Sequence, residues 1–131
     1  MQTAIQASPI PRKSLWAGRI ISTLIVLFLL FDVVLKLVKP GFVVEANIRL
    51  GYSENLIVPI ALVLLVCTVL YAIPRTSVLG AILLTGYLGG ATATHVRVGD
   101  PFLFAVLFGV LVWGGLFLRD RSLRALIPLR R

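Results

Sequence analysis

The chain has 131 residues, of which 59% are hydrophobic and only 14% are charged. A soluble domain carries about a quarter charged residues, so this composition argues against a soluble protein and indicates a single membrane domain. The formal net charge is +8, but the basic residues cluster at the ends of apolar segments and are not interleaved with aromatic residues. This distribution argues against nucleic acid as a partner and favours contact with anionic lipid headgroups.

The chain contains one cysteine, Cys67, and one histidine, His95. A single cysteine cannot form a disulfide within the chain, and the sequence has no Cys-x-x-Cys redox motif. One histidine and one cysteine also cannot build a structural zinc site or hold a haem from both sides. We therefore expect no metal site and no evident cofactor in this chain alone.

Four apolar segments follow one another along the chain. Residues 1–14 are polar and contain two prolines, so we expect a flexible cytoplasmic tail. The first apolar segment, residues 15–38, is long for the hydrophobic region of a signal peptide and lacks a small-x-small cleavage site, which indicates a retained helix. Further apolar segments cover about residues 56–73, 77–96 and 102–118. Each has roughly 17 to 24 residues, enough to cross a hydrocarbon core of ~30 Å.

The connections between these segments predict their arrangement. Tight turns at residues 71–76 and 97–101 join the second segment to the third and the third to the fourth, which makes these pairs antiparallel neighbours. Residues 39–55 are expected to form a longer loop. The predicted fold is therefore all-α, a transmembrane four-helix bundle with up-down-up-down topology over residues 15–118.

The basic residues predict the orientation in the membrane. Nine of them lie on the side of the two chain ends and four lie on the other side. By the positive-inside rule, we expect a multi-pass protein of the inner (cell) membrane with both termini in the cytoplasm. Residues 119–131 alternate arginine with leucine and isoleucine, which predicts a basic tail lying on anionic headgroups. A docking surface for a cytoplasmic partner is the alternative for this tail.

Small residues form one face of the third apolar segment. Gly86 and Gly90 make a G-x-x-x-G pattern, which Gly89 and Ala93 reinforce. Such a face allows a neighbouring helix to approach closely. We expect it to pack on a helix of the same chain, with a second copy in a homo-oligomer as the alternative. The pattern is not a phosphate-binding loop, because no strand precedes it.

Two charged residues lie near the end of the first apolar segment. Asp32 precedes Lys36 by four residues, the order and spacing that favour an ion pair on one helix face. Asp32 is expected in the outer third of the membrane, where an unpaired carboxylate is costly. Two interpretations stay open: the pair neutralises itself within the helix, or it lines a cavity and handles a ligand or protons.

His95, Arg97 and Asp100 lie at the outer end of the third segment, at the depth of Asp32 and Lys36. On a regular helix Arg97 shares the small-residue face, whereas His95 lies on the opposite side. His95 is either an interfacial residue or a ligand contact that can change its charge near neutral pH. The five residues together predict an outward-facing polar pocket roofed by the long first loop. Neither a catalytic triad nor metal-ligand spacing is evident among them.

Four blocks of the sequence are distinctive: LFLLFDVVLKLVKP, LGYSENL, LYAIPRTSVLGAILLTGYLGGATATHVRVGDP and WGGLFLRDRSLRALIPLR. Together they resemble the DoxX-like family of small bacterial membrane proteins, over about residues 15–130 and most specifically over 73–101. The resemblance implies a four-helix membrane bundle. The broader DoxX group takes its name from a membrane subunit associated with thiosulfate:quinone oxidoreduction, which adds quinone as a candidate cofactor and a respiratory subunit as a candidate partner.

Three functions follow from these observations. The leading one is a non-enzymatic integral inner-membrane protein that binds a small lipophilic ligand or a partner subunit at the outward-facing pocket. The second is a membrane subunit of a quinone-linked oxidoreductase complex, although this chain supplies no evident redox centre. The third is a small oligomeric transporter, which is disfavoured because one four-helix subunit leaves little room for a central path.

Overall fold

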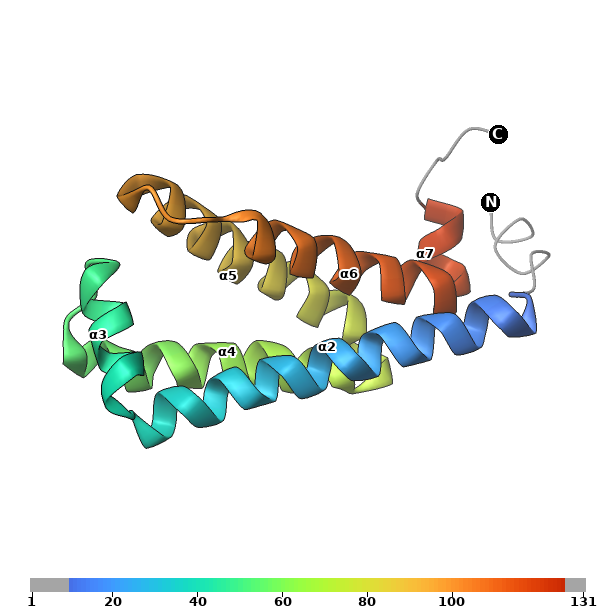
Figure 1. Ribbon diagram of the computed structural model, residues 1–131. Helices are drawn as coiled ribbons and strands as arrows, with labels where there is room; N and C mark the ends of the chain where they lie inside the picture. Colours follow the sequence, from blue (N-terminus) through green and yellow to red (C-terminus); the bar gives the residue numbers. More distant parts are fainter. Residues whose placement is uncertain (1–9, 127–131) are drawn as a thin grey trace.

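The computed structural model describes residues 10–126, and every regular element in that range is helical (Figure 1). Residues 1–9 of the expected N-terminal tail and 127–131 of the expected basic tail lie outside the described residues. The long helices are α2 (Arg12–Val38), α4 (Ile57–Ala72), α5 (Ser77–Val98) and α6 (Leu103–Arg119). The shorter elements are α3 (Gly41–Arg49), η1 (Glu54–Leu56), η2 (Pro74–Thr76) and α7 (Arg121–Leu126).

Within residues 10–126, three stretches are long and apolar enough to cross a membrane: α2, η1 with α4, and η2 with α5. Helix α6 is apolar but shorter, with 17 residues, which gives a length of about 26 Å at 1.5 Å per residue. Large apolar side chains cover the outward faces of the helices; Leu24 on α2 and Val66 on α4, for example, are 61% and 57% exposed. Because water would penalise such a surface and lipid would not, these features fit a membrane protein.

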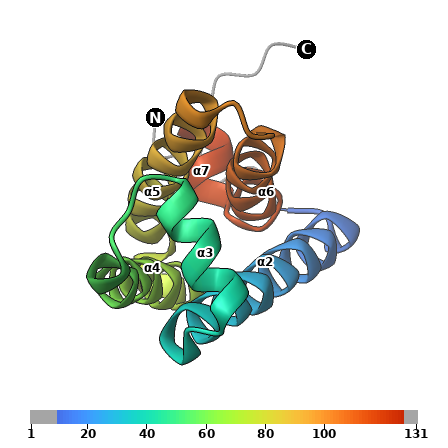
Figure 2. The same cartoon turned by 60° about the vertical axis from the view of Figure 1, so that its left-hand side comes forward.

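The four long helices pack in a ring. Helix α2 contacts α4 and α6, and α5 contacts the same two helices from the other side (Figure 2). Helices α2 and α6 run in opposite directions: Gly18 near the start of α2 lies against Gly115 near the end of α6, and the ring of Phe28 further along α2 lies 4.5 Å from that of Phe108, between their centres. We call the end where α2 begins and α6 finishes the terminal end, and the opposite end, which α3 covers, the α3 end (Figure 1).

Three buried glycines set the helix spacing at the terminal end. A Cβ atom at Gly80 would overlap the backbone of Tyr71 on α4. At Gly115 it would lie 2.6 Å from Ser22 Oγ, and at Gly18 it would lie 2.7 Å from the carbonyl oxygen of Gly115. The backbones therefore approach closely because these positions carry no side chain.

Tyr71 is fully buried and links three helices through its hydroxyl group. The hydroxyl donates to the carbonyl oxygen of Val112 at 2.7 Å and accepts from Ser22 Oγ at 3.0 Å. Because each hydroxyl has one hydrogen, the bond to the carbonyl sets the direction of the next one. Ser22 Oγ in turn accepts from Arg119 Nε at 3.0 Å, and the Arg119 guanidinium lies 5.5 Å from the centre of the Tyr71 ring. This chain of bonds joins α2, α4 and α6.

Proline ends α4 and sets up the tight turn into α5. Ile73 precedes Pro74 and adopts an extended conformation, with φ −83° and ψ 122°, as expected for a residue before proline. Ser77 then donates its hydroxyl hydrogen back to the carbonyl oxygen of Tyr71 at 2.8 Å. The turn thereby satisfies a carbonyl group that the end of α4 leaves without a helical partner.

The structure corrects our expectation of a long loop over residues 39–55, because α3 and η1 lie within it. Helix α2 ends where Lys39 adopts the left-handed conformation (φ 57°), directly before Pro40. In the following helix, Val43 and Asn47 are one turn apart and both are buried. A single pair of inward residues is too short a pattern to predict a helix, and its burial depends on the bundle beneath it.

The small-residue face of α5 does not pack on another helix within residues 10–126. A Cβ atom at Gly86, Gly89 or Gly90 would have no atom of a neighbouring helix within 4 Å, in contrast to the glycines at the terminal end. Ala93 on the same face is exposed. The reason is that α5 meets α4 closely at Gly80 and the two helices diverge toward the α3 end (Figure 1). Packing of this face on a second copy of the chain stays a prediction.

Replacing Gly80 with alanine should destabilise the protein by about 1–3 kcal/mol or more, because the added methyl group must displace the Tyr71 backbone. Gly114→Ala is the matched control, since a Cβ atom there meets nothing within 4 Å and alanine has the higher helix propensity by up to ~1 kcal/mol. Unfolding of both purified variants in detergent would measure the difference. Equal stability of the two variants would contradict the close contact.

Candidate functional site

A cavity with two compartments lies beneath α3, where α5 and α6 diverge from α4 and α2 (Figure 1). The first compartment has a volume of about 420 Å³ and lies between α4 and α5. The second has a volume of about 400 Å³ and lies between α2 and α6. We call the two together the α3 cavity. The residues that line both compartments are Lys36, Asn47, Leu50, Tyr87, Ala91 and His95.

Glycine contributes the open wall of the first compartment. Gly86 and Gly90 line it together with apolar residues of α4 such as Ile60 and Val63. Since no atom of another helix lies near the Cβ positions of the two glycines, the missing side chains leave space for a ligand. The G-x-x-x-G pattern thus borders the cavity in this structure.

Lys36 and Asp32 form the ion pair that their spacing predicts. Lys36 Nζ lies 2.5 Å from Asp32 Oδ2, and the two side chains are 13% and 37% exposed. Lys36 lines both compartments, whereas Asp32 lines the second. The pair is therefore internal to α2 and also lines a cavity, so the two interpretations of the sequence are compatible. An ammonium group has three hydrogens, and two of them remain after the bond to Asp32.

His95 lines both compartments and is oriented by its own helix. Its Nδ1 lies 2.7 Å from the carbonyl oxygen of Ala91. Because a carbonyl oxygen can only accept, Nδ1 carries the hydrogen, and Nε2 of the neutral ring is left as an acceptor. Protonation of the ring would turn the same nitrogen into a donor.

Sequence reasoning missed Tyr87, which also lines both compartments. Its hydroxyl group forms no hydrogen bond with the residues that the structure describes. Tyr87, Ala91 and His95 are four residues apart in turn, so they share one face of α5. The signal that could have identified Tyr87 is its position two helical turns before His95, because both residues combine an aromatic ring with a polar group and lie on the same helix face.

Asn47 and Tyr52 line the cavity on the side that α3 covers. Neither of them was identified from the sequence as a candidate site residue. The amide of Asn47 donates to the carbonyl oxygen of Val43 at 2.9 Å and is buried within α3. Tyr52 follows α3, and its hydroxyl lies 2.9 Å from Thr94 Oγ1 on α5. Because the Thr94 hydroxyl donates to a backbone carbonyl one turn earlier, Tyr52 is the donor of the bond between them.

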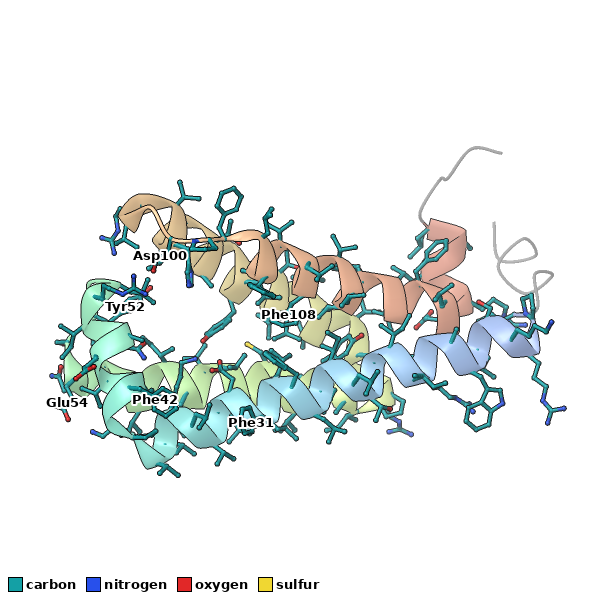
Figure 3. All side chains as sticks on the ribbon, in the orientation of Figure 1. Phe31, Phe42, Tyr52, Glu54, Asp100 and Phe108 are labelled. Atoms are coloured by element: carbon teal, nitrogen blue, oxygen red, sulfur yellow. The ribbon has the colours of Figure 1, made fainter. Side chains whose placement is uncertain are left out.

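Arg97 and Asp100 hold α3 in place and do not line the cavity. Arg97 Nη2 donates to the carbonyl oxygen of Leu50 at 2.7 Å. Asp100 pairs with Arg49 of α3, with 2.8 Å between Nη1 and Oδ1. Figure 3 labels Asp100 and Tyr52, which both lie at the α3 end. His95 and Arg97 thus have different surroundings, as the helical geometry predicts, and the five candidate residues divide between the cavity and its cover.

Comparison with known proteins gives a family but no close relative. A family model described as the DoxX-like family matches residues 20–115, well over half of the chain. No curated protein and no solved structure matches. The matched range includes every residue common to the two compartments. Within the described part of the chain, no group of three or more histidine, cysteine or acidic residues is placed to hold a metal ion.

Replacing Asp32 with asparagine should lower stability, because Lys36 would keep its charge in a largely buried position without a carboxylate partner. We expect a loss of about 1–3 kcal/mol, between the values for an exposed and a fully buried pair. Glu54→Gln makes the same change of charge in the exposed pair with Lys39, whose atoms are 4.0 Å apart, and should change stability little. Thermal unfolding in detergent measures both; a loss in Glu54→Gln as large as in Asp32→Asn would contradict the prediction.

Proposed function

We propose that this chain, which belongs to the DoxX-like family, is a membrane protein that binds a small lipophilic ligand in the α3 cavity. The observation that supports this proposal is the convergence of Lys36, Tyr87 and His95 where two otherwise mainly apolar compartments meet. Small-molecule sites in proteins have this form, with volumes of ~300–1,000 Å³ and a few polar groups that orient the ligand.

The charges of the cavity favour a ligand with a neutral polar group. Asp32 neutralises Lys36, so an anionic group would compete with a carboxylate already in place. Lys36 and Tyr87 can donate hydrogen bonds to a carbonyl or hydroxyl oxygen, and His95 Nε2 can accept one or, when protonated, donate one. An apolar tail would occupy the first compartment beside Gly86 and Gly90, where the helix surface has no side chains.

A quinone is one ligand with these properties, because its carbonyl oxygens accept hydrogen bonds and its ring and tail are apolar. Binding of a quinone would support the second candidate, a membrane subunit of an oxidoreductase complex in which a partner subunit supplies the redox centre. A lipophilic ligand without redox chemistry would support a binding protein that acts by itself, as a homo-oligomer or with a membrane partner.

The proposed membrane arrangement has four crossings in up-down-up-down order, with α6 as the fourth. Two observations support it: α6 is apolar and packs between α2 and α5, and Arg19, Arg75 and Arg119 lie at the terminal end of the helices. By the positive-inside rule, the terminal end faces the cytoplasm and the α3 cavity opens toward the other side of the inner membrane.

Labelling of single cysteines tests this orientation. Cys67 is the one native cysteine and is buried, so it is replaced by serine first. In this background a membrane-impermeant maleimide added to intact cells should label Glu45→Cys on α3 and leave Arg75→Cys unlabelled, whereas lysed cells should label both. Labelling of Arg75→Cys alone in intact cells would show the opposite orientation.

Filling the first compartment should displace the ligand. Gly90→Leu places a side chain in the compartment, and we expect at least about a tenfold loss of the ligand that copurifies with the protein, because occupied volume excludes it. Gly114→Leu adds the same side chain to α6 outside the cavity, at a position that is open around its Cβ, and should retain the ligand.

Solvent extraction of both variants and of the unmodified chain, followed by mass spectrometry and ultraviolet absorbance, identifies and quantifies the bound compound. A compound with the absorbance of a quinone supports the oxidoreductase candidate. Equal ligand content in the two variants, or the absence of any compound beyond membrane phospholipids in the unmodified protein, would contradict binding in the α3 cavity.

A further inference from the structure

A second groove lies at the terminal end and shares no residue with the α3 cavity. Its volume is about 490 Å³, and its walls come from one face of α2, the end of α4 and the end of α6. We call it the terminal groove. Arg19 and Arg119 supply two positive charges, and Asp120 supplies one negative charge. The groove is therefore cationic, whereas the ion pair in the α3 cavity is neutral.

Arg119 is held in a defined position without being neutralised. Its Nε donates to Ser22 Oγ at 3.0 Å, and its guanidinium lies over the fully buried ring of Tyr71. It belongs to no ion pair within residues 10–126. The two Nη atoms, which form the fork of the guanidinium, are therefore available to an acceptor in the groove. Such a fork matches the oxygen atoms of a phosphate group, and fixing it beforehand reduces the entropy lost on binding.

The acidic residue beside Arg119 already has a structural role. Asp120 Oδ1 accepts the backbone N–H of Leu123 at 2.9 Å, which caps the start of α7. Its carboxylate would repel an anion, so it opposes part of the attraction of Arg119. With Arg19 included, the groove keeps one net positive charge, and an anionic ligand is favoured over a neutral one.

The groove becomes apolar with depth. Arg19 lies beside Trp16, with 5.6 Å between its guanidinium carbon and the ring centre, and tryptophan is typical of the boundary between headgroups and hydrocarbon. Val26 and Leu27 line the same groove about 10 Å further along α2, at 1.5 Å per residue. A ligand that fits both parts has a charged head and an apolar chain.

We propose that the terminal groove binds an anionic phospholipid, whose phosphodiester contacts Arg119 and Arg19 and whose acyl chain lies along Val26 and Leu27. Inorganic phosphate shares the chemistry of the head but cannot use the apolar wall. A zwitterionic phospholipid has the same phosphate and chains, but its cationic amine cancels the charge that the groove favours.

The full-length chain, purified and delipidated in a maltoside detergent, is the sample for the test. Phosphatidylglycerol, phosphatidylcholine with the same acyl chains and inorganic phosphate are added separately, and native mass spectrometry and thermal unfolding record binding and stabilisation. We expect phosphatidylglycerol to bind about tenfold more tightly than phosphatidylcholine and to raise the Tm, because the choline cation of phosphatidylcholine is repelled by the net positive charge of the groove and phosphatidylglycerol has no such cation. Equal stabilisation by inorganic phosphate, or equal binding of the two lipids, would overturn the proposal.

Three arginine variants locate the site. Arg19→Ala and Arg119→Gln should both lose the preference for phosphatidylglycerol. Arg75→Ala removes the same charge at the same end but outside the groove, and should keep the preference. Because Arg119 also supports Tyr71, its variant could fail to fold; Arg19 is exposed, so Arg19→Ala then decides the test. An unchanged preference in Arg19→Ala, or an equal loss in Arg75→Ala, would show that the lipid does not bind in the groove.

Discussion

The buried hydroxyl of Tyr71 is the contact on which the arrangement of the helices depends. It joins α4 to α2 through Ser22 and to α6 through the Val112 carbonyl. Gly80 allows α5 to pack closely against the backbone of the same residue. All four long helices therefore meet at one residue at the terminal end, α2 and α6 through the Tyr71 hydroxyl and α5 through the Tyr71 backbone. An amphiphilic residue can do this within an apolar interior because each of its hydrogen bonds is satisfied there.

The close contact at one end explains the space at the other. Helices that touch through glycine at the terminal end diverge along their length, and the polar side chains near the α3 end then border an opening. Helix α3 covers that opening and is attached to the end of α5 by Arg97 and by the pair of Arg49 with Asp100. Of the five candidate residues, Arg97 and Asp100 therefore shape the cavity by holding its cover, and Asp32, Lys36 and His95 line it.

The two ends of the molecule differ in charge, and this difference separates their proposed ligands. In the α3 cavity a carboxylate neutralises the ammonium group, which suits an uncharged lipophilic molecule. In the terminal groove a guanidinium rests on an aromatic ring and keeps its charge, which suits a phosphate.

The features that depend on local spacing could be predicted from the amino-acid sequence. It predicted the all-helical fold, apolar helices long enough to cross a membrane, the ion pair of Asp32 with Lys36, and the different surroundings of His95 and Arg97, because these follow from length, hydropathy and the helical repeat. Which glycines make contacts, the cavity that α3 covers, and the place of Tyr87 in the lining of both compartments follow from the tertiary structure alone. Those features depend on how the helices cross. The crossing is set by contacts such as Ser22 with Tyr71 and Gly18 with Gly115, which join residues far apart in the sequence whose proximity no short pattern encodes.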